Sequence, residues 1–239
     1  MNSDKEYLKY LYVDIEEPLR LGFCEEIKLA SDFSIYRISD IFLWKELSSD
    51  YQVNLIIDYF RNLKKKSEKE LLICAHGNYG IKKLIDEINF KLFNPCYLAV
   101  KTDNVSYDIK TDLVIKKLSL DYAELIGSTY RMIKDYPNRV ELAQEFINRG
   151  VFGGFVNDKC IGFIGMHEEG TMGMLEVLPE YFHRGYGSAL EMYLCNHLIS
   201  ENRIPFCHII NGNEASIKLQ KKIGLYVFSE EHMVYWGSS

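Results

Sequence analysis

The stretch that decides the fold is LEVLPEYFHRGYGS, residues 175–188. An apolar run ends at Pro179, the glycines Gly185 and Gly187 follow, and an apolar-periodic segment begins at Ala189. This order predicts a strand, a tight turn with little side-chain bulk, and a helix. A helix that begins on such a turn presents unpaired backbone N–H groups and the positive end of its dipole, which together bind phosphate. The stretch therefore predicts a site for a phosphate-bearing cofactor.

The residues on both sides of this stretch predict a fold that mixes helices and strands. We assign it to the α/β class, in the broad sense that includes α+β folds. In the second half we expect strands over 113–118, three within 151–177 with a tight turn at 157–158, and one over 206–210, and helices over 122–132, 140–148, 188–199 and 214–223. In the first half we expect strands over 71–75 and 96–100, which form a parallel unit, and helices over 40–47, 53–66 and 80–93. No internal repeat is evident.

A polar segment, residues 101–112, follows the apolar run at 96–100 and is the best candidate for a domain boundary. We therefore expect an N-terminal α/β domain over residues 1–105 and a second domain over residues 106–239.

Composition narrows the classes of function. The 239 residues carry a net charge of −6, which argues against general nucleic-acid binding. No apolar run approaches the roughly 18 residues of a membrane helix, and the N-terminus lacks the apolar core of a signal peptide. We therefore expect a cytoplasmic protein that does not bind a membrane. We further expect it to be a monomer or a homodimer. The six cysteines form no CxxC pair and are predicted to be free thiols. The six histidines show no HxxxH or HExxH spacing, so no metal is expected.

Residues 175–188 resemble motif A of the GNAT superfamily of acyl-CoA-dependent N-acyltransferases, roughly L-x-V-x-P-E-Y-[RQ]-x-x-G-x-[GA]. Phe182 stands where the family usually has Arg or Gln. A second segment, Asn213–Leu225, is similar to the family's N-x-x-[AS]-x-x-L-[Y]-x-x-x-G-F, with Gln220 in place of the usual Tyr. The resemblance covers residues 112–236 and implies a mixed, mostly antiparallel sheet flanked by helices.

The resemblance also implies acetyl-CoA as cofactor, with the backbone of the strand pairing with the pantetheine arm and the turn binding the pyrophosphate. The cofactor-binding residues that it implies are Leu175, Val177, His183, Arg184, Gly185, Tyr186, Gly187, Ser188, Asn213, Ser216, Leu219 and Lys222. Plainer alternatives remain for single residues: the glycines can serve close helix–strand packing, Asn213 can be only a helix N-cap, and the lysines near Lys222 can be dipole partners.

The implied reaction is transfer of an acetyl group to a primary amine of a small molecule, such as an amino acid, with a protein N-terminus or lysine as the alternative acceptor. The candidates for acid–base catalysis are Glu176, Glu169 and Tyr226. A family-typical base lies near Thr171, where no carboxylate stands. A CoA-binding sensor or a catalytically lapsed module is the alternative function.

Residues 1–105 match neither motif. They are either a degenerate second GNAT-like half, as in the glycine N-acyltransferase-like branch of the family, or an unrelated α/β domain used for dimerisation. We favour the degenerate half.

Overall fold

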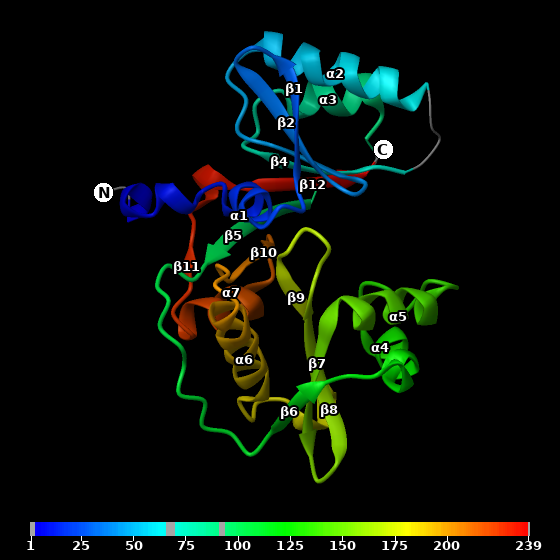
Figure 1. Ribbon diagram of the computed structural model, residues 1–239, viewed down its shortest axis with the longest axis vertical. Coiled ribbons are helices and arrows are strands. Elements are labelled where there is room, and N and C mark those ends of the chain that lie inside the picture. The colour runs from blue at the N-terminus through cyan, green and yellow to red at the C-terminus, as the bar shows by residue number, and fades with distance from the viewer. Residues whose placement is uncertain (1–2, 66–69, 91–93, 239) are drawn as a thin grey trace. The chain divides into compact units, whose positions relative to one another are not determined.

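The computed structural model describes residues 3–65, 70–90 and 94–238 (Figure 1). The chain divides into two compact units. Unit 1 comprises Met1–Val100, His208–Lys221 and Leu225–Ser239, and unit 2 comprises Lys101–Cys207 and Lys222–Gly224. The C-terminal strands thus pack with the first hundred residues, which the linear division into 1–105 and 106–239 does not anticipate.

Unit 1 is built on an eight-stranded sheet with the strand order β1-β2-β3-β4-β12-β5-β10, and β11 pairs with β5. Its strands are β1 (Glu25–Ala30), β2 (Phe33–Ile38), β3 (Ile41–Trp44), β4 (Leu72–His76), β5 (Asn94–Val100), β10 (Phe206–Ile210), β11 (Tyr226–Val227) and β12 (Val234–Ser238). Strands β3 and β4 are parallel neighbours. Strand β12 runs antiparallel to both β4 and β5, so the predicted parallel pair β4 and β5 is separated by the last strand of the chain.

Helices cover both faces of this sheet. They are α1 (Val13–Leu21), α2 (Asp50–Lys64), α3 (Ile81–Ile88) and α7 (Glu214–Lys222). Phe42 and Trp44 of β3 pack into the core under α2 and α3, which lie together in Figure 1, whereas Ile41 and Leu43 pack with Ile15 of α1. Because both faces are buried, β3 is an unbroken apolar run. The predicted helix over 40–47 is therefore wrong: such a run does not distinguish a buried strand from a helix.

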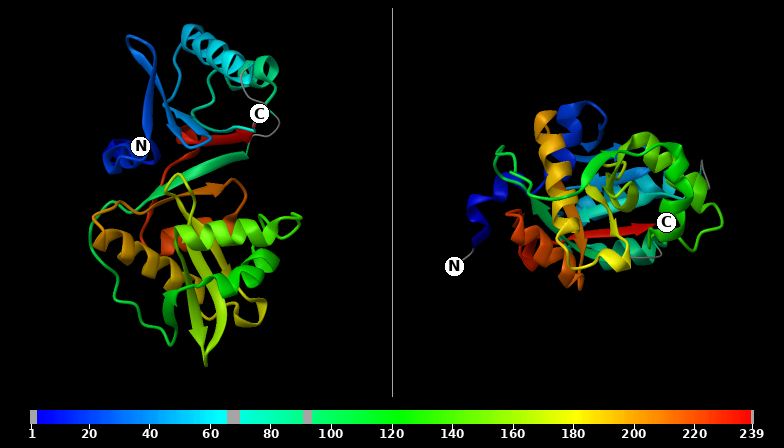
Figure 2. Two further views of the ribbon diagram at one scale, coloured as in Figure 1. Left: turned by 45° about the vertical axis from the view of Figure 1, so that its right-hand side comes forward. Right: turned by 90° about the horizontal axis from the view of Figure 1, so that it is seen from below.

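Unit 2 holds a four-stranded sheet of order β6-β7-β8-β9, antiparallel throughout. The strands are β6 (Val114–Lys117), β7 (Val151–Val156), β8 (Lys159–Met166) and β9 (Met172–Val177), and the helices are α4 (Ala123–Thr129), α5 (Arg139–Gly150) and α6 (Tyr186–Ser200). Phe155 packs with α4 and α5, whereas a Cβ at its neighbour Gly154 would meet Leu190 of α6. Helix α6 and the pair α4 and α5 thus flank the strands, as the ribbon shows (Figure 2). The predicted mixed, mostly antiparallel architecture flanked by helices is confirmed.

The described elements follow one order twice. Strands β1, β2 and β3, helix α2, strand β4, helix α3 and strand β5 repeat as β7, β8, β9, α6, β10, α7 and β11. In each set the first three strands pair antiparallel in sequence. Helices α2 and α6 thus hold equivalent places, each directly after the third strand of its set.

Most of the predicted helices and strands are present, although some predicted helix ends differ. The turn at Asn157 and Asp158 has both residues in the left-handed region, with φ of 48° and 62°, as a tight hairpin requires. The helix predicted over 80–93 is too long: α3 ends at Ile88, because Asn89 takes the left-handed conformation of a C-cap, with φ of 54°. The helix predicted over 122–132 likewise ends at Thr129, where Tyr130 is extended. The predicted helix end at Lys66 and residues 91–93 lie outside the described residues. All six cysteines are free, as predicted. Within the described ranges, no helix is both long enough and apolar enough to cross a membrane.

Candidate functional site

The start of α6 is open. Gly185 is its N-cap residue, and the first helical hydrogen bond runs from the Ala189 N–H to the Gly185 carbonyl at 3.0 Å. The N–H groups of Tyr186, Gly187 and Ser188 precede that bond and have no acceptor among the described residues, and no side chain caps the helix there. Three neighbouring N–H donors at the positive end of a four-turn helix are an arrangement suited to an anion.

The two glycines of this turn differ in what their position requires of the residue. Gly185 has a φ of +82°, a conformation that other residues rarely adopt, and a Cβ there would meet nothing within 4 Å. Gly187 lies in the helix without such a φ, and a Cβ there would meet only Leu175 and Val177, each at an ordinary 3.9 Å. Neither glycine is therefore required by close helix–strand packing. A glycine inside a helix costs about 0.5–1 kcal/mol relative to alanine, so Gly187 keeps the backbone bare at a price in stability.

Polar and cationic side chains surround the turn. Within unit 2, Lys222 Nζ lies 3.5 Å from Ser188 Oγ. Arg184 is exposed, and its guanidinium donates to the Glu180 carbonyl at 3.2 Å. The Tyr186 hydroxyl donates to Asp112 at 3.2 Å and anchors the first helical residue. Asp112 thus fixes the side chain of the first helical residue, and Lys222 places a cation beside Ser188.

Strand β9 leads into this turn and is irregular. Phe163 pairs with Glu176 and Gly165 with Gly173, so β9 carries one more residue than β8 between these pairs. Met174 absorbs the extra residue with a φ of 56°. Bulges of this kind re-aim the side chains that follow them. Because β9 is the last strand of the four-stranded sheet in the described chain, its outer backbone groups are available to a ligand.

Glu176 stands on the opposite face of β9 from Leu175 and Val177 and meets the segment after α4. Its Oε1 accepts the Arg131 N–H at 3.4 Å and lies 3.9 Å from Arg131 Nε. The Glu176 side chain is 23% exposed. Burial raises the pKa of this carboxyl above its usual value, and Arg131 and Lys134 only partly oppose that effect. A carboxylate with a raised pKa binds a proton more readily than a solvated one.

A second carboxylate lies on the same β8–β9 hairpin. Glu169 is 6% exposed, and its Oε1 accepts the Thr171 hydroxyl at 2.5 Å. A carboxylate therefore does reach Thr171, folded back from the turn. Burial, with added effects of Glu176 and Glu169, raises the pKa of Tyr130 well above that of a free phenol. Tyr130 is a functional candidate that could not be predicted from the sequence. It belongs to no motif, and it lies near Glu176 and Glu169 only in the folded protein.

The residues of the second motif are divided between the units. The Asn213 side chain accepts the Ser216 N–H at 3.2 Å and so caps α7, as the plainer alternative supposed. Ser216 and Leu219 are half-buried on α7 in unit 1, whereas Lys222 belongs to unit 2. Tyr226 also belongs to unit 1, where its hydroxyl donates to Asp4, so the acid role predicted for it competes with that bond.

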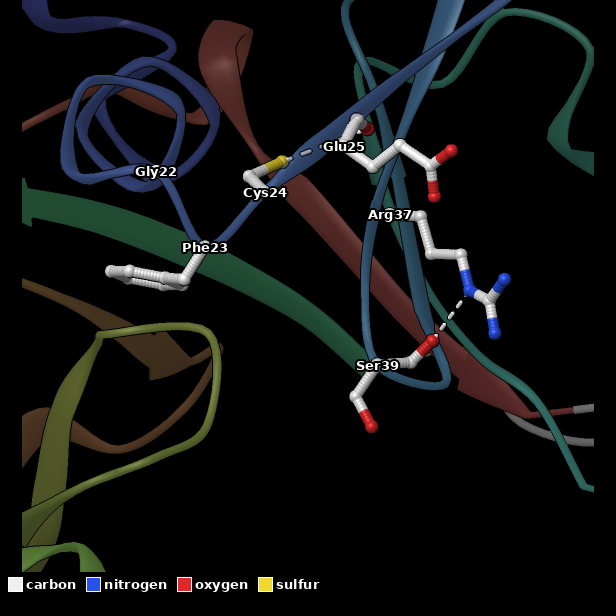
Figure 3. A pocket seen from close by; sticks show the side chains of 6 residues that line it. All are labelled: Gly22, Phe23, Cys24, Glu25, Arg37 and Ser39. Carbon is white, nitrogen blue, oxygen red and sulfur yellow. Dashed lines mark hydrogen bonds between the residues drawn. The ribbon is translucent and has the colours of Figure 1, made fainter.

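A hollow of about 340 Å³ lies in unit 1, where α1 ends and the β2–β3 turn passes (Figure 3). Its lining residues are Gly22, Phe23, Cys24, Glu25, Arg37 and Ser39. The Arg37 guanidinium donates to the Ser39 carbonyl at 2.7 Å, and burial raises the pKa of the Cys24 thiol to about 11. A protonated thiol is a poor nucleophile, and no predicted site residue lines this hollow.

Residues 148–236 match the family model described as FR47-like protein. The fold is that of GNAT acetyltransferase structures. A GCN5-related N-acetyltransferase from Kribbella flavida aligns with a TM-score of 0.59 at 8% identity, over 97% of this chain and 94% of its own. A putative GNAT-family acetyltransferase from Novosphingobium aromaticivorans aligns with a TM-score of 0.56 at 10% identity, over 96% of each chain.

A tandem GNAT protein from the clavulanic acid biosynthesis pathway aligns with a TM-score of 0.55 at 11% identity, over 95% of this chain and 87% of its own. No curated protein sequence matches the chain. At these identities the likeness concerns the fold, and it extends over both repeated sets of elements. The glycine N-acyltransferase-like branch is not distinguished by these matches.

Proposed function

We propose that the protein is an N-acetyltransferase that moves an acetyl group from acetyl-CoA to a primary amine of a small molecule, such as an amino acid. The observation that carries the proposal is the open start of α6, where Gly187 leaves three N–H donors bare at a cost in helix stability. The GNAT fold and the FR47-like match over residues 148–236 agree with it.

The residues around this helix start fit the anionic part of acetyl-CoA. The N–H groups of Tyr186, Gly187 and Ser188 suit a pyrophosphate, because phosphate oxygens accept several donors at once. Lys222 adds positive charge beside Ser188, and Arg184 adds positive charge on the turn that precedes the helix. The outer edge of β9, at Leu175 and Val177, offers backbone groups to the amide-bearing pantetheine arm. When bound, acetyl-CoA supplies a thioester carbonyl as the electrophile.

Glu176 is the residue that we assign to proton transfer. An amine attacks a carbonyl only after it loses its proton, and a carboxyl with a raised pKa is a better acceptor for that proton than a solvated one. Glu169, held by Thr171, adds a second negative charge on the same hairpin and favours a cationic acceptor. Tyr130 keeps its proton beside them, so the site also holds a neutral hydrogen-bond donor.

The first set of elements, β1 to β5, is on this proposal a degenerate GNAT-like half. Its element order repeats that of the second set, and the tandem GNAT protein aligns over 95% of this chain. It lacks an open helix start after its third strand, so it is assigned no cofactor of its own.

The experiment is a pair of measurements on the full chain. The first is the shift in Tm with CoA, acetyl-CoA and a matched nucleotide without pantetheine, since a ligand of the native state must stabilise it. The second is release of free CoA thiol over a panel of small amines, amino acids and lysine peptides. We expect both CoA forms to raise Tm and a small amine to be acetylated.

The possible outcomes separate the functions. Stabilisation by acetyl-CoA without turnover on any amine points to a CoA-binding sensor. Turnover only on peptides moves the acceptor to a protein amine. If neither CoA form shifts Tm at millimolar concentration, the cofactor assignment fails and the enzyme proposal fails with it.

A further inference from the structure

Unit 1 contains a buried cluster of metal-ligating side chains that the acetyl-transfer proposal does not use. Asp14 comes from α1, Cys74 and His76 from β4, and His208 from β10. Asp14 and Cys74 are fully buried, and the side chains of His76 and His208 are 3% and 6% exposed. All four lie on the face of the sheet that α1 covers, since Ile15 and Cys74 share that core.

The distances converge on one carboxylate oxygen. Asp14 Oδ2 lies 3.2 Å from His208 Nε2 and 3.7 Å from Cys74 Sγ. His76 Nε2 lies 2.9 and 3.0 Å from the two oxygens of the same carboxylate. Donor atoms of Asp14, Cys74 and His208 all lie within 4.8 Å of one another.

Hydrogen bonding alone does not satisfy this cluster. His208 Nε2 is buried at 3.2 Å from Asp14 yet has no hydrogen bond of acceptable geometry among the described residues. The second ring nitrogen of His76, Nδ1, is likewise buried without a partner in the part of the chain that the structure describes. His208 Nε2 thus faces the Asp14 carboxylate without a well-formed hydrogen bond, and a buried imidazole nitrogen in that state is costly unless another contact replaces the bond.

The donor set has the chemistry of a zinc ligand set. Zn²⁺ binds thiolate at about 2.3 Å and imidazole or carboxylate at about 2.0–2.2 Å, so tetrahedral ligands stand about 3.3–3.8 Å apart. The separations of 3.2 and 3.7 Å from Asp14 to His208 and Cys74 are close to that spacing. His76 is the nearest further donor.

We infer that Asp14, Cys74 and His208, with His76 beside them, form a Zn²⁺ site that fastens α1 and β10 to the centre of the unit 1 sheet. The ligands are far apart in sequence, which is why spacing motifs do not reveal the site. A metal that binds only the folded arrangement stabilises it by mass action.

Trp236 gives the site a built-in reporter. Its indole N–H donates to His208 Nδ1 at 3.0 Å. A cation bound at His208 Nε2 uses the lone pair of that nitrogen, so the proton of the neutral ring must lie on Nδ1. The Nδ1–H of His208 would then face the indole N–H of Trp236, and two donors cannot bond to each other. Zn²⁺ must therefore break the Trp236–His208 hydrogen bond, and the half-buried Trp236 changes its surroundings.

The test uses the full chain, stripped with a chelator and titrated with Zn²⁺ or Co²⁺. We expect equimolar metal to be retained after desalting, Tm to rise, and the Co²⁺ form to show the thiolate charge-transfer band and the visible bands of a tetrahedral site. Trp emission should change on Zn²⁺ addition, and Trp236→Phe should abolish that change while Trp44 remains.

The matched variants are Cys74→Ser and Cys96→Ser, two buried cysteines of the same core. Cys74→Ser should lose the Co²⁺ thiolate band and at least tenfold in Zn²⁺ affinity, whereas Cys96→Ser should keep both. Equal metal binding by the two variants overturns the proposal. If Cys74→Ser does not fold, the unmodified chain still decides: a Co²⁺ titration without a thiolate band rejects the site. Acetyl-CoA binding by unit 2 is measured separately, so failure here leaves the acetyl-transfer proposal standing.

Discussion

Helices α2 and α6 hold the same place in the repeated element order, yet they begin in opposite ways. At α2 the Ser49 hydroxyl accepts the Gln52 N–H at 3.4 Å, and the Gln52 side chain accepts the Ser48 N–H at 2.8 Å. These two bonds satisfy backbone donors around the helix start with nearby side chains. At α6 no side chain caps the helix.

The strands before these helices differ in the same sense. Strand β3 is closed by a parallel neighbour, with Ile41 opposite Leu72 and Trp44 opposite Ala75. Strand β9 ends its sheet in the described chain and leaves backbone groups unpaired on one side. One element order therefore gives either a helix start and strand edge satisfied by the protein itself or a pair left open, and the open pair is where we propose that acetyl-CoA binds.

The largest expected effect comes from closing the open helix start. Gly187→Glu places a carboxylate among the N–H donors, where it occupies the phosphate position and repels the ligand. We expect loss of measurable acetyl-CoA binding by calorimetry, with the circular dichroism spectrum unchanged. The unaltered protein should bind one acetyl-CoA per chain, because α2, the equivalent of α6 in the first set of elements, is capped by side chains.

Gly187→Ala is the matched control for that change. Its Cβ would stand 3.9 Å from Leu175 and Val177, so it fits, and it should stabilise the helix by about 0.5–1 kcal/mol. Acetyl-CoA affinity should fall far less than with Glu. Two bound molecules per chain, or full binding by Gly187→Glu, would contradict the contrast between α2 and α6.

The next effect concerns Glu176 of β9, since β3, the equivalent strand of the first set, carries no carboxylate. Glu176→Gln should lower kcat about 100-fold or more, because general base catalysis contributes on that order, while KM for acetyl-CoA changes little. In the unaltered protein, kcat/KM should rise with pH as Glu176 ionises, and the apparent pKa of this rise should lie above that of an ordinary glutamate. Glu176→Gln should lose this pH-dependent rise.

Stability provides the control for Glu176→Gln. A glutamate whose folded pKa is raised stabilises the fold below its unfolded pKa, and that contribution is lost as pH rises through the folded pKa. At neutral pH the ionised Glu176 is therefore unfavourable, and Gln should leave Tm equal or higher. A lower Tm together with lost activity would mean that Glu176 serves the fold rather than the reaction.

The strand, turn and helix around residues 175–188 could be predicted from sequence because their signals are local. Glycine at 185 and 187, the apolar run before Pro179 and the periodic segment after it each restrict the backbone within a few residues. The same locality explains the error at β3, where IFLW is buried on both faces and carries no period to read.

Contacts between distant segments were beyond sequence reasoning. Nothing in the sequence indicates that β12 pairs between β4 and β5, because strand pairing depends on the whole sheet. The same holds for Tyr130 beside Glu176 and for Glu169 folded back to Thr171. The repeated order of elements is likewise visible only in the fold, since equivalent helices retain no shared motif.

A smaller effect is expected where α2 is closed. Ser49→Ala removes the side-chain cap and should lower the free energy of unfolding by about 1 kcal/mol, measured by urea denaturation. Acetyl-CoA affinity should not change, because the cap serves only its own helix. If Ser49→Ala weakened acetyl-CoA binding instead, the first set of elements would take part in the site, and the contrast between the two helix starts would be incorrect.

The smallest effect concerns the charge next to the open helix. Lys222 lies 3.5 Å from Ser188, and an exposed cation of this kind contributes about 0.5–1 kcal/mol, so Lys222→Met should weaken acetyl-CoA binding about two- to fivefold. Lys221→Met, one residue earlier and on another side of α7, should have a weaker effect. The difference between the two variants should shrink as salt rises, because added ions screen exposed charges. Equal losses at every salt concentration would assign the effect to the net charge of α7, and backbone donors alone would then define the anion site at α6.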